Sequence, residues 1–204
     1  MRPVVAIVAM LVGCGRFHFD ATSGGDAGPS DAPAHVDDGG TATCNSVARI
    51  ADTFATDQRA TLWAGSYFDG TSSATASGGK LTLAGQANAD DSYGAFRTLS
   101  FYDLRGARTF VRVNQVASAG AVTGFGVEWS QAAYLHIEQA TGTLSAIVEV
   151  NGMITETAQI PYLVGTHVYW AISERAGRIY FETSTDGVTF ATFYELAAPF
   201  DVSL

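Results

Sequence analysis

Short runs in which apolar and polar residues alternate follow one another along the chain from about Val47 onward. In 123–131 (TGFGVEWSQ), Phe125, Val127 and Trp129 alternate with glycine, acidic and small polar residues. Side chains alternate between the two faces of a strand, so this run predicts a strand with one core face and one polar face. The same alternation predicts strands in 133–139, 143–151, 166–173 and 178–184.

Glycine lies between these runs, where the chain has to reverse its direction. The turn pairs are Thr141-Gly142, Asn151-Gly152, Ala176-Gly177 and Asp186-Gly187, and glycine adopts the positive φ of a tight hairpin turn at little cost. No run shows helical periodicity for longer than a turn or two. The pattern predicts an all-β domain over 47–204, and the uneven run lengths favour an antiparallel two-sheet sandwich over a closed barrel.

The first apolar run of the chain does not alternate. It extends from Pro3 to Gly13, which is about half the length of a membrane-spanning helix. The positive charge of Arg2, the short apolar core and the small residue at its end are typical of a secretory signal peptide. The last residues, 11–14 (LVGC), resemble the lipobox of bacterial lipoproteins. This resemblance implies that residues 1–13 are removed and that Cys14 carries the lipid.

The resemblance to bacterial lipoproteins also implies a location in the bacterial cell envelope. Each CH₂ group of an acyl chain on Cys14 that enters a membrane would contribute about 0.8 kcal/mol of binding free energy. One chain binds only marginally, so more than one chain is needed for stable anchoring. Gly15 is not the aspartate that some bacteria use for inner-membrane retention, so we expect the outer membrane or the cell surface. With Cys14 lipidated, Cys44 has no partner in the chain, and no intrachain disulfide is predicted.

A change in composition separates the signal peptide from the β domain. Residues 21–43 consist almost entirely of Gly, Ala, Ser, Thr, Asp and Pro, with no aromatic residue. Such a segment cannot bury enough apolar surface to offset the entropy of ordering it. We therefore predict a flexible tether over 14–46, which would hold the domain away from the membrane.

The charge of the chain narrows the range of partners. There are 11 Lys and Arg residues against 20 Asp and Glu, which gives a formal net charge of −9. Binding to nucleic acid depends on clustered basic residues, and so does electrostatic attraction to anionic lipid headgroups. The sequence therefore predicts no nucleic-acid partner and a membrane contact that depends on the lipid alone.

Longer segments resemble the concanavalin A-like lectin and glucanase domains of exported bacterial proteins. In 166–201, a His and an aromatic residue open a strand, a Gly turn and an acidic strand follow, and the segment ends in Ser-x-Asp-Gly and Pro-Phe-Asp. Residues 93–116 and 78–85 are similar to earlier parts of these domains. The resemblance implies a jelly-roll sandwich with a concave face that often binds carbohydrate. It also implies a strand after Pro-Phe-Asp, so 47–204 either lacks its last strand or has a very short one.

The sequence does not contain a catalytic motif of this class. Glycanases of the fold carry their carboxylates in a Glu-x-Asp-x-x-Glu run, because one group acts as an acid and the other as a nucleophile or base. The nearest arrangement here is Glu128, Glu138 and Glu149, one in each of three predicted strands. A Gly-x-Ser-x-Gly elbow and an HExxH motif are also missing from the sequence. We therefore expect no enzyme, and glycoside hydrolysis is the third hypothesis.

A binding face is the leading hypothesis. Aromatic and charged residues alternate with the core positions of four predicted strands and are the candidate ligand-binding residues: Glu128, Tyr134, His136, Glu138, Tyr169, Arg178, Tyr180 and Glu182. Rings stack on the apolar faces of sugars, and carboxylates bind their hydroxyl groups. The first hypothesis is a non-catalytic carbohydrate-binding module, and the alternative is a structural or adhesive envelope protein that binds another protein. A third interpretation is that a loop or the second sheet covers these residues.

Two weaker metal hypotheses complete the sequence analysis, and no other cofactor is expected. His136 and Glu138 lie on the same side of a predicted strand, and His167 is the only other histidine in the domain that could complete a metal site with them. Asp90 and Asp91 in 88–94 (NADDSYG) offer the hard oxygen ligands that calcium prefers.

Overall fold

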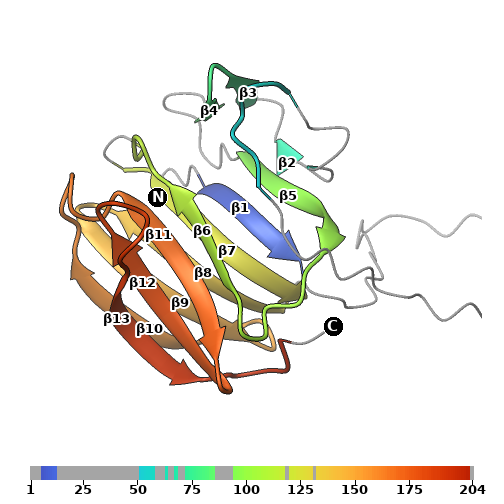
Figure 1. Cartoon of the computed structure of the whole chain (residues 1–204), viewed down its shortest axis with the longest axis vertical. Coiled ribbons are helices and arrows are strands. Elements are labelled where there is room, and N and C mark those ends of the chain that lie inside the picture. The colour runs from blue at the N-terminus through green and yellow to red at the C-terminus, as the bar shows by residue number, and fades with distance from the viewer. Residues whose placement is uncertain are drawn as a thin grey trace, which may run out of the picture.

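The computed structural model describes residues 6–12, 51–57, 63, 67–68, 72–85, 94–117, 120–130 and 132–202. Within these ranges every regular element is a β-strand, which confirms the all-β prediction, and most neighbouring strands are antiparallel (Figure 1). The predicted lipidation site Cys14, the tether 14–46 and the candidate calcium ligands Asp90 and Asp91 lie outside the described residues.

The larger sheet combines a run of hairpins with three further strands. It has seven strands in the order β10-β9-β8-β7-β1-β5-β2. The hairpin strands are β7 (Val122–Ser130), β8 (Ala133–Ala140), β9 (Thr143–Val150) and β10 (Met153–Pro161), and each pairs antiparallel with the next. The other three strands are β1 (Ala6–Val12), β5 (Gly94–Phe101) and β2 (Tyr67–Phe68).

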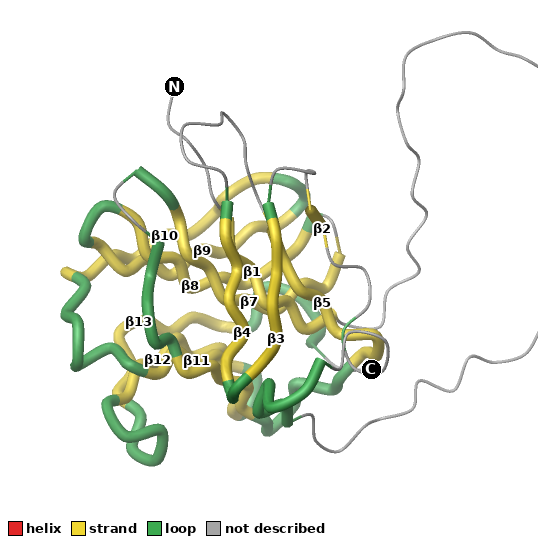
Figure 2. Tube along the Cα trace, turned by 90° about the horizontal axis from the view of Figure 1, so that it is seen from above, coloured by secondary structure: helices red, strands yellow, loops and turns green. Residues whose placement is uncertain are grey.

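The smaller sheet is antiparallel throughout and lies opposite the larger one (Figure 2). Its four strands follow the order β13-β12-β11-β6, formed by β13 (Ala191–Ala197), β12 (Arg178–Ser184), β11 (Tyr169–Arg175) and β6 (Arg108–Arg112). A separate hairpin consists of β3 (Ser73–Ser77) and β4 (Lys80–Ala84). The five strands predicted from alternation correspond to β7, β8, β9, β11 and β12.

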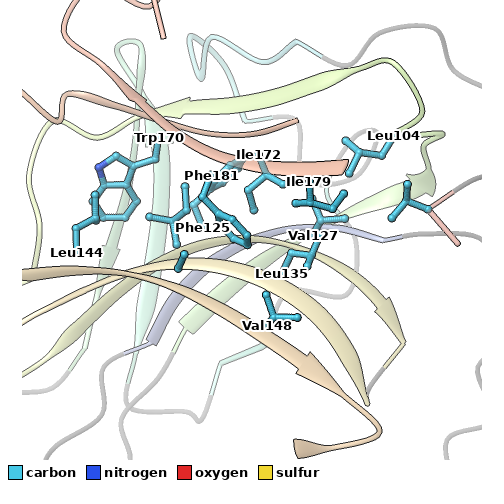
Figure 3. Packing of buried hydrophobic residues seen from close by; sticks show 13 residues of the cluster. Leu104, Phe125, Val127, Leu135, Leu144, Val148, Trp170, Ile172, Ile179 and Phe181 are labelled. Atoms are coloured by element: carbon cyan, nitrogen blue, oxygen red, sulfur yellow. The ribbon is translucent and has the colours of Figure 1, made fainter. Parts of the chain in front are cut away.

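The hydrophobic core lies between the two sheets and consists of the apolar positions that alternate along their strands (Figure 3). Phe125, Leu135 and Val148 come from the larger sheet, and Trp170 and Phe181 come from the smaller one. The indole Nε1 of Trp170 donates a hydrogen bond of 3.0 Å to a backbone carbonyl, so this large side chain is buried without an unpaired donor. The core therefore directs the polar positions of both sheets outward.

Strand β1 has an unexpected position. The sequence predicts residues 1–13 as a signal peptide, and the apolar core of that segment forms β1, an inner strand of the larger sheet. Ala6–Val12 pairs parallel with β7 over seven positions and parallel with β5 over five. Strands β5 and β7 consequently run in the same direction, with one strand between them.

Three of the hairpin turns share one geometry and differ only at their first residue. Thr141-Gly142, Asn151-Gly152 and Ala176-Gly177 each connect two strands, with positive φ at both positions. Asparagine tolerates this left-handed conformation, whereas the β-branched Thr141 is strained in it. Thr141 and Asn151 are both exposed, so packing does not obscure the comparison.

We expect Thr141→Asn to raise the free energy of unfolding by about 1 kcal/mol, because the substitution relieves a strained left-handed residue. The reciprocal variant Asn151→Thr should lower the free energy of unfolding by a similar amount. Urea denaturation of the purified chain measures both values. Shifts in the same direction for the two variants would contradict this explanation of the turns.

Candidate functional site

The outer face of the larger sheet gathers polar residues from three neighbouring strands. Their cross-strand partners form rows, in which Glu128 of β7 lies beside Tyr134 of β8 and Tyr134 lies beside Glu149 of β9. His136 and Glu138 follow Tyr134 along β8 at intervals of two residues. These positions alternate with the core residues of the same strands, so they lie on the face away from the core. We call Glu128, Tyr134, His136, Glu138 and Glu149 the acidic face.

His136 is the most unusual residue of the acidic face. It is only 5% exposed, and neither of its ring nitrogens has a hydrogen-bond partner. Its ring stacks on that of Tyr134 with 4.2 Å between the centroids and 26° between the planes. A carboxylate oxygen of Glu138 lies 3.7 Å from Nδ1, beyond hydrogen-bond distance. A buried imidazole with two unpaired nitrogens carries a desolvation cost of about 1–3 kcal/mol.

A glycine in the neighbouring strand makes room for this imidazole. Gly126 of β7 lies directly opposite His136, and a Cβ atom placed on Gly126 would overlap Cδ2 of the His136 ring. The His136 ring therefore occupies the space in which a side chain at 126 would lie, and any larger residue at 126 would displace it. Gly126 is a functional candidate that the sequence analysis did not identify.

Tyr134 is held as a neutral phenol. Burial raises the pKa of Tyr134, and its hydrogen bond to the Glu149 carboxylate and the negative charges of Glu138 and Glu128 raise it further. The hydroxyl group therefore keeps its proton at any physiological pH. Glu149 was not among the predicted ligand-binding residues, although its alternation with Val148 and Val150 does place it on the outer face.

The chemistry of the acidic face is that of hydrogen-bond acceptors beside aromatic rings. Its carboxylates accept hydrogen bonds, the imidazole has two ring nitrogens for hydrogen bonding, and the stacked rings offer apolar surface. Within the described ranges, no group of three or more His, Cys, Asp or Glu residues is arranged to hold a metal ion. The arrangement fits an uncharged ligand that is rich in hydroxyl groups.

The remaining predicted residues lie on the outer face of the smaller sheet, around Glu182. This carboxylate is 1% exposed and accepts hydrogen bonds of 2.9 Å from Arg108 Nε, Ser173 Oγ and Arg175 Nη2. The Arg175 guanidinium also lies 3.8 Å from the ring centroid of Tyr180. The oxygens of Glu182 are thus fully engaged within the protein, and this residue stabilises the sheet.

The loop after β12 packs against part of this second face. Ser184 and the backbone N–H groups of Val188 and Thr189 hydrogen-bond to the Asp186 carboxylate, which holds the loop and lowers the pKa of Asp186. The loop brings Phe190 to 4.4 Å from the Arg108 guanidinium and within ring contact of Phe110. The loop contacts therefore reach only part of this face, and Arg178 remains exposed.

The eight predicted residues therefore do not form one site. Four of them belong to the acidic face, namely Glu128, Tyr134, His136 and Glu138. The other four come from β11 and β12 of the smaller sheet, namely Tyr169, Arg178, Tyr180 and Glu182. Arg178 forms an exposed ion pair with Glu195 at 2.9 Å, an interaction that contributes little to stability.

His167, the other candidate metal ligand, has a structural role in the turn before β11. It is buried, and its Nδ1 accepts a hydrogen bond of 3.3 Å from the backbone N–H of Leu163. Its carbonyl accepts the Trp170 indole hydrogen bond. Burial lowers the pKa of His167 and keeps its imidazole neutral. The structure thus assigns His167 to the support of the core.

Comparison of the chain with protein-family models, with curated proteins and with solved structures gives no match. Across the residues described above, no helix has both the length and the apolar character that are needed to cross a bilayer.

We expect Gly126→Ala to lower the free energy of unfolding by about 2 kcal/mol, because the new methyl group overlaps the His136 ring. His136→Ala removes the side-chain part of the overlap, although the backbone oxygen of Leu135 stays 2.7 Å from the new Cβ. Adding Gly126→Ala to that variant should therefore cost about 1 kcal/mol less than it costs in the parent chain. Urea denaturation of the parent, the two single variants and the double variant gives the coupling. If the changes in the free energy of unfolding of the two single variants simply added up in the double variant, the contact between residue 126 and the His136 ring would be contradicted.

A second prediction concerns pH. The unfolded chain binds a proton at His167 more readily than the folded chain, because burial lowers the folded pKa. Stability from neutral His167 is therefore fully present above about pH 6.5 and is lost as the pH falls through the lowered folded pKa. His167→Asn, whose side-chain oxygen can accept the Leu163 hydrogen bond, should lose less stability than the parent between pH 7 and 5.5. Equal losses in urea denaturation would contradict this assignment.

Proposed function

We propose that the chain is a lipid-anchored protein of the bacterial cell envelope whose β domain binds carbohydrate without catalysis. The domain would be of the concanavalin A-like sandwich type, and the lipid would be attached to Cys14, placing the protein in the outer membrane or at the cell surface. The observation that carries the binding proposal is the buried, unpartnered imidazole of His136 under the Tyr134 ring.

A sugar can supply the hydrogen-bond partner that the ring nitrogens of His136 lack. A hydroxyl group can both donate and accept a hydrogen bond, so it can pair with a nitrogen of His136 and with a neighbouring carboxylate at once. The apolar face of a pyranose ring fits against an aromatic ring. The three glutamates of the acidic face and the net charge of −9 favour a neutral or amino sugar over an acidic one.

The alternative is an adhesive role in which the domain binds another protein. It is supported by exposed apolar residues at the edge strand β10, where Met153 is 65% exposed and Ile154 is 60% exposed. Ile154 lies beside Glu149, so this apolar edge is continuous with the acidic face. Protein interfaces often combine an apolar centre with a polar rim.

A glycan array probed with the purified full-length chain, with calcium and again with EDTA, tests the proposal. We expect saturable binding to one class of neutral or amino sugar, and Tyr134→Ala should weaken it at least tenfold because the stacking surface and the Glu149 hydrogen bond are lost. Tyr180→Ala is the matched control, because Tyr180 lies on the other sheet and packs against Arg175.

The outcomes of the array separate the hypotheses. Binding that is lost in EDTA would add a metal, for which Asp90 and Asp91 are the candidate ligands. A blank array from a folded sample would contradict carbohydrate binding and favour the protein-binding alternative. Equal loss in both tyrosine variants would show that the acidic face is not the site.

A further inference from the structure

Strand β1 occupies an inner position that processing at Cys14 would empty. It lies between β5 and β7 and pairs with both of them, and Ala6–Val12 falls within the segment 1–13 that signal-peptide removal would release. This inference rests on the processing step of the proposed function. The precursor and the mature chain would then differ at the middle of the larger sheet.

The gap left by β1 has the width of one strand. Neighbouring strands in a sheet lie about 4.8 Å apart, so β5 and β7 would face each other across about 10 Å. Both would expose a row of unpaired backbone N–H and C=O groups, over seven residues of β7 and five of β5. Such a row is a template for pairing with another strand.

Both sides of the gap are anchored by packing within the domain. Phe125 and Val127 fix β7 in the core between the sheets. Phe96 of β5 is 1% exposed and meets the Trp63 ring at 6.1 Å between centroids. The Trp63 indole in turn donates a hydrogen bond of 2.6 Å to Asp52. These contacts oppose a direct closure of β5 onto β7.

We propose that, once the leader is removed, the gap between β5 and β7 accepts a β-strand from another polypeptide. The occupant is an uncharged, apolar segment of about seven residues, matching β1 (AIVAMLV). The central register position, now held by Ala9, lies beside Phe125 and Phe96, which favours an apolar residue there. The positions of Val8 and Met10 lie beside Gly124 and Gly126 on β7 and beside Ala95 and Arg97 on β5. The His136 ring already occupies the space over Gly126.

The occupant runs antiparallel to β5 and β7. Among the described strands of the larger sheet, the only parallel pairs are the two that β1 makes with its neighbours. Because β5 and β7 run in the same direction, a strand of opposite direction would make every pair in the sheet antiparallel. Antiparallel pairing is slightly more stable per residue, and strand addition of this kind is a common mode of peptide recognition.

The experiment uses the full chain with a site-specific protease sequence inserted in 21–43 and an affinity tag at the N-terminus. After cleavage, the tagged leader fragment is removed in mild denaturant, and the domain is refolded with a fluorescent peptide. The peptides are the leader strand AIVAMLV, its reversed sequence VLMAVIA, and each of these with the equivalent of Ala9→Asp. Lysines at both ends keep the peptides soluble. Reversing both sequence and direction keeps each residue beside the same neighbours, so VLMAVIA reports the antiparallel arrangement.

We expect VLMAVIA to bind the leader-free domain saturably, with one peptide per chain, and to raise its thermal midpoint. The uncleaved chain, in which β1 fills the gap, should bind it at least tenfold more weakly, and the aspartate peptide should bind at least tenfold more weakly to the leader-free domain. Fluorescence anisotropy and thermal denaturation measure these effects.

Three results would overturn the proposal. A leader-free domain that refolds and binds none of the peptides would show that β5 and β7 close on each other. Binding of AIVAMLV alone would reject the antiparallel occupant. Equal binding by the cleaved and uncleaved chains would place the peptide outside the gap. None of these measurements involves sugar or lipid, so a blank glycan array would leave the strand-binding result unchanged. A Cys14 without lipid in mass spectrometry would instead remove the processing step on which the proposal rests.

Discussion

The apolar contact between the two sheets is the interaction on which the other features of this protein depend. Trp170 and Phe181 of the smaller sheet pack against Phe125, Leu135 and Val148 of the larger one. Alternate residues of a strand point to opposite faces, so when one face of the strand is buried in the core, the residues between the core positions lie on the outer face. The acidic face and the Glu182 cluster both follow from this single choice of register, and a slip of one residue would exchange core and surface.

Alternation predicted the strands that have one buried face, and it failed where that condition does not hold. Strand β10 is an edge strand whose first five residues are all exposed, so its sequence has no reason to alternate. Strand β1 has the opposite difficulty, since a continuous apolar run suits an inner strand and a signal-peptide core equally well. The turn residues Asn151-Gly152 and Thr141-Gly142 were predictable because their backbone geometry is local.

The face of each candidate residue was predictable, but its accessibility was not. Glu182 and His136 both alternate with core residues and both lie on outer faces, as the pattern indicates. Glu182 is buried because a later loop brings Phe190 over the sheet and arginines from two other strands converge on it. His136 is buried because Gly126 of the next strand lets its ring lie against the backbone. These causes are contacts between separate segments, which no local pattern contains.

Strand β7 connects the acidic face with the proposed strand exchange. One edge of β7 pairs with β8, where Gly126 lies opposite His136, and its other edge pairs with β1, where the same Gly126 lies beside Met10. The backbone of β7 therefore supports the His136 imidazole at one edge. At the other edge, pairing with β1 sets the position of β7. A strand that replaces β1 restores the hydrogen bonds that hold β7 in place, and with them the surface on which His136 and Tyr134 stack. The two proposals thus share one structural requirement, which is a paired strand at the inner edge of β7.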